Sequence, residues 1–151
     1  MKTNKRLFIL ILFFITSCGY QPLYVNKNNS NLVFSKIELF GDKEINRRII
    51  SFISIKEDKS EEKLNQLVLR SNEDIIETSK DSKGRVATLK TTVEIKLVIL
   101  DGNQIIKEKT FNENFSYNNK DNKFDLTKYQ NEIKNNLVDK IIEQMSIYLS
   151  L

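Results

Sequence analysis

Hydrophobic and polar residues alternate in the middle of the chain, and the alternation is most regular over residues 87–99. On one face lie Ala87, Leu89, Val93, Ile95, Leu97 and Ile99, and on the other lie Thr88, Lys90, Thr92, Glu94 and Lys96. A period of two residues predicts a β-strand. We therefore expect a sheet with one buried face and one face in water, as antiparallel sheets allow.

Three further segments, 32–40, 64–78 and 105–117, are predicted as strands. In the first, Val33, Ile37 and Leu39 share one parity, whereas the alternation of the second is imperfect. On one face of the third lie Ile105, Phe111, Phe115 and Tyr117, of which Phe111 and Phe115 are expected in the core. Lys107 and Lys109 interrupt this face, which suits an edge strand protected from pairing with other chains.

Two amphipathic helices are predicted from apolar residues spaced three or four apart. The first follows Gly41 and a candidate N-cap at Asp42, and its apolar residues are Ile45, Ile49, Phe52 and Ile53. The second begins near Asp125 and carries a longer apolar stripe, expected in the core, of Leu126, Tyr129, Ile133, Leu137, Val138, Ile141, Ile142, Met145, Tyr148 and Leu149.

Turn residues and charged runs separate these elements. The Asp-Gly-Asn sequence at 101–103 is typical of a hairpin, residues 80–85 form a second turn, and the mixed charge run 56–63 is interpreted as a solvated connection. The predicted order is strand, helix, strand, strand, strand, helix. The fold class is therefore α+β, a four-stranded, mostly antiparallel sheet with two helices packed on one face.

The N-terminus has the pattern of a bacterial lipoprotein signal. Lys2, Lys5 and Arg6 precede the apolar run 7–15, and two small residues lead to Cys18, the one cysteine of the chain. About 20 apolar residues are needed to span a bilayer, so this run is too short for a membrane anchor. We expect residues 1–17 to be removed, Cys18 to carry lipid, 18–31 to form a lipidated N-terminus and tether, and 32–151 to form one α+β domain.

Charge and composition exclude several functions once the signal is set aside. Three of the 24 basic residues belong to the signal, which leaves 21 against 20 acidic residues. This near-neutral balance argues against nucleic-acid binding. The chain has no histidine, the commonest general base and metal ligand, and no carboxylate pair with catalytic spacing. We therefore expect no enzymatic activity, no cofactor and no metal site.

The segment from Cys18 to Tyr24, Cys-Gly-Tyr-Gln-Pro-Leu-Tyr, resembles the start of mature LPS-assembly lipoproteins (the LptE-like family). The order of the predicted elements is similar to that family, as is the stretch 115–126 that leads into the last helix. The resemblance implies an outer-membrane lipoprotein that faces the periplasm, without enzymatic activity. It also implies a role as plug and assembly chaperone of an LptD-like β-barrel, in support of lipopolysaccharide delivery to the outer leaflet.

Composition is compatible with that role, because a plug in a polar barrel lumen should itself be polar outside. The same composition suits most other water-exposed domains equally well. A different interpretation therefore stays open, in which the chain is a periplasmic pilot or scaffold lipoprotein for another envelope complex such as a secretin.

Two groups of residues are candidate contact sites besides lipidated Cys18. Lys80, Lys83 and Arg85 surround a glycine at a turn and could bind lipid A phosphates through charge-assisted hydrogen bonds, a place where the resemblance also implies basic ligand contacts. Such residues more often only confer solubility, and Asp81 weakens the patch. The second group is Tyr20, Leu23 and Tyr24, which could contact the barrel or the membrane interface, or pack on their own domain.

Overall fold

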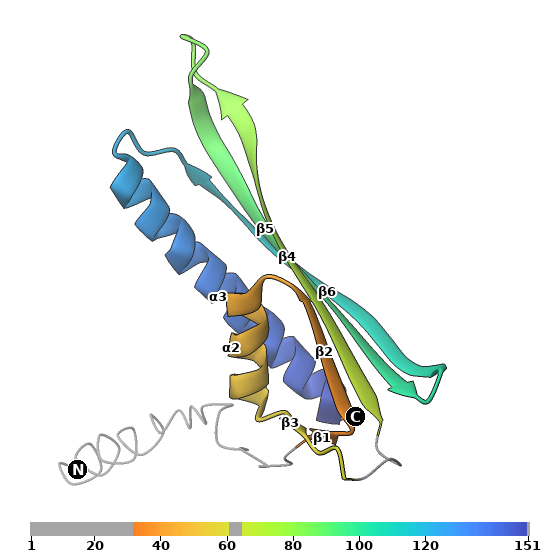
Figure 1. The fold of residues 1–151 in the computed structure, drawn as a ribbon. Coiled ribbons are helices and arrows are strands. Elements are labelled where there is room, and N and C mark those ends of the chain that lie inside the picture. Colours follow the sequence, from red (N-terminus) through yellow and green to blue (C-terminus); the bar gives the residue numbers. More distant parts are fainter. Residues whose placement is uncertain (1–31, 61–64, 151) are drawn as a thin grey trace, which may run out of the picture.

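The computed structural model describes residues 32–60 and 65–150, which form a long twisted sheet with two helices on one side (Figure 1). The strands are β1 (Val33–Phe34), β2 (Lys36–Gly41), β3 (Lys56–Glu57), β4 (Gln66–Lys80), β5 (Val86–Asp101) and β6 (Gln104–Asn118). The helices are α2 (Lys43–Ile53) and α3 (Lys123–Ser150).

The main sheet has the strand order β2-β4-β5-β6. β5 pairs antiparallel with β4 on one side and with β6 on the other, whereas β2 runs parallel to β4. The parallel pair follows from the crossover through α2, because strands joined by a helical crossover return in the same direction. The predicted α+β class, with a mostly antiparallel four-stranded sheet, is confirmed.

The core lies between the helices and one face of the sheet. At its centre, Val93, Ile95 and Leu97 of β5 are fully buried, as the alternation predicts. The helices complete the core with Ile45, Ile49, Ile133, Leu137, Val138, Ile141, Ile142 and Met145, while Leu126, Tyr129, Tyr148 and Leu149 of the predicted stripe are partly buried against it. Neither helix covers the opposite face of the sheet.

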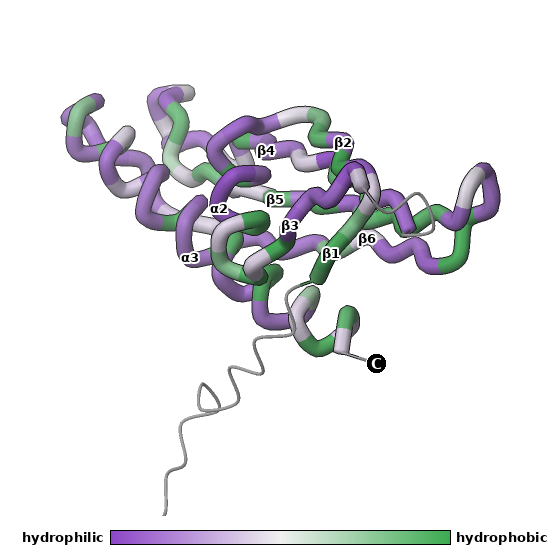
Figure 2. Tube along the Cα trace, turned by 60° about the horizontal axis from the view of Figure 1, so that its bottom comes forward, coloured by the Kyte–Doolittle hydropathy of each residue, from purple (hydrophilic) through white to green (hydrophobic). Residues whose placement is uncertain are grey.

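The predicted strand 32–40 is divided at Ser35 into two strands that join different sheets. β2 pairs with β4, whereas β1 pairs with β3 in a separate parallel pair of two residues each. The backbone N–H of Ser35 donates to the Asn65 carbonyl, 3.0 Å away, at the point of division. The break also changes the parity, so that Phe34 is buried while Val33, predicted on the inner face, is 37% exposed. Figure 2 shows β1 as a hydrophobic segment.

The charge run 56–63 is not only a solvated connection, since its first residues form β3. The Lys56 N–H donates to the Leu32 carbonyl (2.8 Å) and the Asp58 N–H to the Phe34 carbonyl (2.9 Å). Both side chains of β3 are exposed, so the strand is stabilised by backbone pairing, which leaves no apolar pattern in the sequence.

Two aromatic residues assigned to apolar faces lie at the surface. Phe115 is 46% exposed and Phe52 is 55% exposed. Phe115 lies in β6, an edge strand of the sheet, and Phe52 lies in the last turn of α2. Parity places Phe115 on the helix side, but at a sheet edge this does not ensure that a helix covers the residue. The expectation of a core Phe115 is therefore wrong, while that for Phe111, 2% exposed, is correct.

The two lysines that interrupt β6 lie over aromatic rings. Lys109 Nζ is 5.0 Å from the ring centroid of Phe111 and 4.9 Å from that of Tyr148, and Lys107 Nζ is 5.6 Å from the latter. The two rings meet edge to face, with centroids 5.9 Å apart. Cations attracted to ring faces can thus occupy the apolar side of an edge strand while their charges stay near solvent.

An ionic cluster joins α2, β4 and α3. Lys134 is 9% exposed, and its Nζ lies 3.0 Å from a Glu44 carboxylate oxygen and 3.7 Å from one of Glu73. Burial raises the pKa of Glu73 above its ordinary value, against the opposing effect of the Lys134 charge. The two carboxylates together outweigh burial at Lys134 and raise its pKa, so the lysine remains charged. The cluster therefore links the three elements through a partly desolvated charge.

We expect Gly41→Ala to destabilise the fold by roughly 3 kcal/mol or more, since it combines backbone strain with a steric clash. Gly41 has φ +87°, and an added Cβ would lie 1.8 Å from the Ser71 carbonyl oxygen. Gly84→Ala is the matched control, because Gly84 has φ +77° but nothing within 4 Å of the added Cβ. That control should cost only about 1 kcal/mol of strain. Urea unfolding measures the free energy of unfolding of both variants. If the two variants lose the same amount, the predicted clash at Gly41 is contradicted.

Candidate functional site

The β4–β5 hairpin carries the predicted basic turn at its tip. Ser79 pairs with Thr88 and Lys80 with Val86, with a register shift on each side of Ser79. The Thr88 hydroxyl is hydrogen-bonded to those of Thr78 (2.6 Å) and Ser79 (2.7 Å). These side-chain bonds close the end of the ladder where its backbone pairing is irregular, and they fix the base of the turn.

Asp81 organises the turn itself. Its Oδ1 accepts the backbone N–H groups of Lys83 (2.8 Å) and Arg85 (2.9 Å), and its Oδ2 accepts the Arg85 Nε–H (2.9 Å). The backbone hydrogen bond from Arg85 is the largest of the effects that hold the pKa of Asp81 below its usual range. Gly84, at φ +77°, supplies the left-handed residue that the turn requires.

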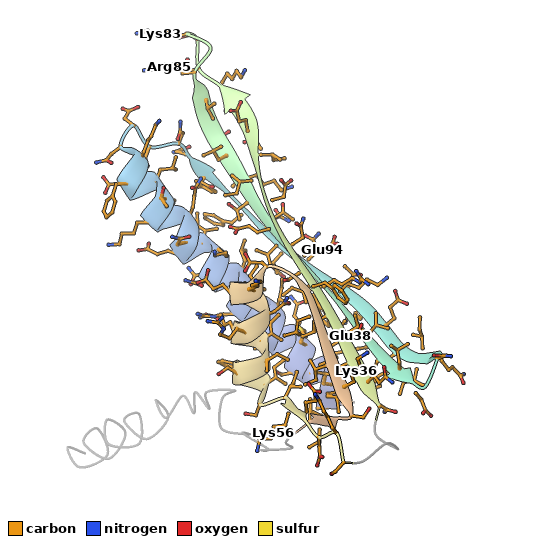
Figure 3. All side chains as sticks on the ribbon, viewed as in Figure 1. Lys36, Glu38, Lys56, Lys83, Arg85 and Glu94 are labelled. Carbon is orange, nitrogen blue, oxygen red and sulfur yellow. The ribbon has the colours of Figure 1, made fainter. Side chains whose placement is uncertain are left out.

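The structure brings Lys80, Lys83 and Arg85 to one tip, but it does not leave them equivalent. Arg85 forms an ion pair with Asp81 (2.8 Å), whereas neither lysine forms an ion pair with a residue that the structure describes. Figure 3 shows Lys83 and Arg85 at the end of the hairpin, far from Lys56 in β3. The site therefore offers two free ammonium groups beside a guanidinium already neutralised by its partner.

A second group, missed by sequence reasoning, consists of the cation Lys120 and the exposed Phe124 and lies beside the base of this hairpin. Asn119 ties the β6–α3 loop to it, since its backbone N–H donates to the Ala87 carbonyl (2.9 Å) and its side-chain amide to the Val86 carbonyl (3.0 Å). Next along the chain, Lys120 Nζ lies 4.2 Å from the Tyr129 ring centroid. Phe124, in the first turn of α3, is 76% exposed.

The signal for this second group was present in the sequence as lysines and a phenylalanine around the start of the last helix. Its position beside the hairpin could not be predicted, because the strand order was unknown. Lys120 and Phe124 extend the site from the tip toward the start of α3. The resulting end of the molecule offers amphipathic contacts, with ammonium groups and one exposed aromatic ring.

The remaining candidate residues, Cys18, Tyr20, Leu23 and Tyr24, lie outside the described residues. Within the described part, no group of three or more histidine, cysteine or acidic side chains could hold a metal ion. No helix of residues 32–60 and 65–150 is both long and apolar enough to cross a membrane.

Solved structures of several bacterial lipoproteins have a similar fold. The sequence matches no family model and no curated protein. Rare lipoprotein B from Shewanella oneidensis superposes with a TM-score of 0.60 at 12% identity, over 76% of this chain and 93% of that one. The chain has the fold of rare lipoprotein B, an LptE-like lipoprotein.

Two further structures share the rare lipoprotein B fold. A minor lipoprotein from Acinetobacter baumannii has a TM-score of 0.52 at 13% identity and covers 76% of this chain and 90% of its own. An uncharacterized lipoprotein B from Nitrosomonas europaea also has a TM-score of 0.52, at 14% identity, over 76% of this chain and 81% of that one. The predicted resemblance to LptE-like lipoproteins is thus confirmed at the level of the fold.

We expect the Asp81–Arg85 contact to survive acidification to the ordinary aspartate pKa of 3.8. A folded-state pKa below the unfolded value means that this contact stabilises the turn above pH 3.8 and is lost only as the pH falls through the lower, folded value. The Arg85 Nε–H resonance, followed by NMR, should therefore change its chemical shift with a midpoint below that pH. A midpoint at or above 3.8 would contradict the expectation. The Asp81→Asn variant, which lacks the carboxylate, is the control that shows the Arg85 Nε–H resonance without the ion pair.

Proposed function

We propose that this protein is the lipoprotein subunit of a lipopolysaccharide-export translocon in the outer membrane. In this role it is anchored through Cys18 on the periplasmic face, acts as plug and assembly chaperone of an LptD-like β-barrel, and has no catalytic activity. The observation that carries the proposal is the rare lipoprotein B fold together with the lipoprotein signal that leads to Cys18. The opening motif of the mature chain supports the same assignment.

The length of the molecule supports a role inside a barrel. The Ser35–Asn65 hydrogen bond places the end of β1 beside the start of β4, and β4 then runs from Gln66 to Lys80. At ~3.3 Å per residue, that strand carries the chain roughly 45 Å. The described chain therefore begins at one end of the molecule, and the basic tip lies at the other (Figure 1).

This distance exceeds the hydrocarbon thickness of a bilayer, which is ~30 Å. A domain that stands in the barrel lumen and is anchored from the periplasmic side could hold its tip near the opposite leaflet. At that position, Lys80 and Lys83 can form charge-assisted hydrogen bonds with phosphate groups of lipopolysaccharide. Lys120 and Phe124 add a cation and an apolar surface for the same amphipathic ligand.

The uncovered face of the sheet supports the same placement. Its polar side chains include the ion pairs Lys36–Glu38 (2.6 Å) and Lys96–Glu108. Arg70 lies over the ring of Phe40 with its guanidinium carbon 4.2 Å from the centroid. A polar, internally paired face suits the water-filled lumen of a large outer-membrane barrel.

Affinity purification of the lipidated protein from detergent-solubilised envelopes tests the proposed partner. We expect one large outer-membrane β-barrel to co-purify in stoichiometric amount, since a plug is held along its whole length. Cys18→Ala, which removes the lipid site, controls for contacts made in the membrane. Recovery of a secretin-like ring instead, or of no barrel from correctly lipidated protein, would reject the plug and favour a pilot or scaffold role.

The double variant Lys80→Glu/Lys83→Glu should reduce binding of purified lipopolysaccharide by tenfold or more. Two charge-assisted contacts of about 1.5 kcal/mol each would be lost, and each 1.4 kcal/mol corresponds to a factor of ten. Lys56→Glu/Lys59→Glu makes the same change of net charge at the opposite end of the molecule. Equal binding by both variants and the parent protein, measured by fluorescence displacement, would remove the tip from the proposal.

A further inference from the structure

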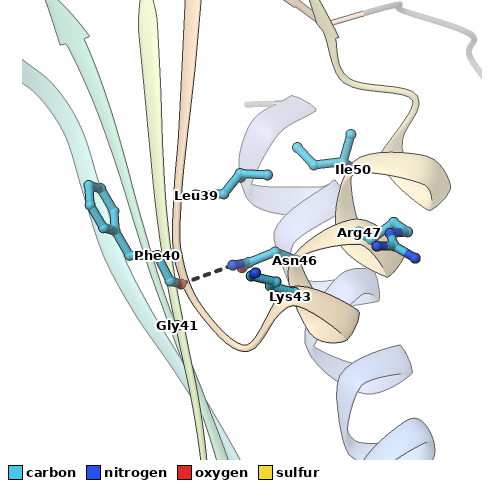
Figure 4. Close-up of a pocket in the computed structure, with 7 residues that line it drawn as sticks. All are labelled: Leu39, Phe40, Gly41, Lys43, Asn46, Arg47 and Ile50. Atoms are coloured by element: carbon cyan, nitrogen blue, oxygen red, sulfur yellow. Dashed lines mark hydrogen bonds between the residues drawn. The ribbon is translucent and has the colours of Figure 1, made fainter.

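A groove lies between the outer strand of the sheet and the first helix, at a distance from the basic tip. It has a volume of about 530 Å³ and lies between β2 and α2. Figure 4 shows Leu39 on the strand and Ile50 on the helix as its apolar walls, with Lys43 and Arg47 on the helical side. Leu39 is 46% exposed, so the main core does not cover this part of the strand.

The strand that forms one wall is an edge of the sheet. β2 pairs with β4 along Lys36–Gly41 without a register break, and no other strand of the described residues pairs with it on its other side. An unpaired strand edge presents backbone N–H and C=O groups that can pair with another extended segment. Binding by strand addition combines such backbone hydrogen bonds with pockets for alternate side chains.

The groove is held open by contacts at its closed end. The side-chain amide of Asn46 donates to the Phe40 carbonyl (2.9 Å), which joins α2 to the end of β2. The Ser71 hydroxyl donates to the carbonyl of Asp42 (3.1 Å), the residue between β2 and α2. Since Asn46 is 2% exposed and Ser71 4% exposed, these bonds fix the angle at which the chain leaves the strand and enters the helix.

The two cations on the groove are placed unfavourably for the isolated protein. Lys43 is the first residue of α2, where the helix dipole disfavours positive charge. Arg47 follows at i+4, where like charges repel. Neither forms an ion pair with a described acidic residue, whereas the adjacent Arg48 forms a bidentate pair with Asp139 (2.9 and 2.8 Å). A carboxylate bound from outside would relieve both effects.

We propose that this groove binds an extended, acidic segment of a partner protein by strand addition to β2. The backbone of the segment pairs with the free edge of the strand, and an apolar side chain fills the space between Leu39 and Ile50. A carboxylate on the same face pairs with Lys43 and Arg47. The free strand edge favours a peptide over a phospholipid, because only a peptide supplies a matching row of backbone donors and acceptors.

Fluorescence anisotropy with the full lipidated protein in detergent tests the site. The probe is a labelled decapeptide, Val-Thr-Glu-Thr-Val-Thr-Glu-Thr-Val-Thr, in which valine and glutamate take turns on one face of the strand and threonine occupies the other. Its twin has the same sequence with alternate backbone nitrogens methylated. We expect saturable binding of the first peptide, at least tenfold weaker binding of the twin, and slower hydrogen exchange over residues 36–41 in the complex. Absence of saturation up to about 1 mM peptide, the weak end of specific affinities, would overturn the proposal.

The double variant Lys43→Glu/Arg47→Glu should weaken peptide binding by tenfold or more while the fold, measured by circular dichroism, stays intact. Lys80→Glu/Lys83→Glu is the matched control, with the same change of net charge at the hairpin tip, and should change binding by less than twofold. Equal losses in both variants would reduce the effect to general electrostatics. Binding of phosphatidylglycerol vesicles that depends on Lys43 and Arg47, without peptide binding, would overturn the proposal and assign the groove to lipid.

Discussion

The antiparallel pairing of β4 with β5 is the constraint on which the rest of the structure depends. β5 is paired on both sides, and its register with β4 extends from Leu100 to Val86, at the base of the basic turn. Because side chains alternate, this register assigns every residue of the sheet to the helix-covered or the uncovered face. It also sets the distance between the tip and the end of the molecule where the described chain begins.

The two helices act on one face of this scaffold, and their different lengths have different consequences. α3 lies along the sheet and buries its apolar stripe against β5 and β6. The shorter α2 follows directly from an edge strand and reaches α3 through Lys134 and Glu44. Since α2 leaves the outer side of β2 partly open, the arrangement that closes the core also creates a groove at the edge.

The resulting molecule has three regions with distinct chemistry. Basic residues and an exposed phenylalanine gather where the β4–β5 hairpin meets the start of α3, and an apolar groove with unpaired cations lies at the β2 edge. Between them, the uncovered sheet face has its own ion pairs. The ligand proposed at the tip and the protein segment proposed at the edge would therefore bind to separate surfaces, with the polar face of the sheet between them.

Sequence alone predicted the elements whose signals are local. The alternation over 87–99 defined β5 and its buried face, the spacing from Leu126 to Leu149 defined α3, and Asp42 was correctly predicted as an N-cap that accepts the N–H groups of Glu44 and Ile45. Each of these depends on periodicity or on hydrogen bonds within a few residues. The basic turn was also placed correctly at a hairpin, since turn residues act locally.

Only the tertiary structure decided the features that depend on pairing between distant segments. Pairing of residues 56–57 with β1 divides the first predicted strand, and an edge position exposes Phe115 despite its parity. The Asp81 contacts neutralise Arg85, while Asn119 brings Lys120 near the same hairpin. The physical reason is that periodicity reports which face of an element is apolar, whereas strand order and packing determine which neighbour, if any, covers that face.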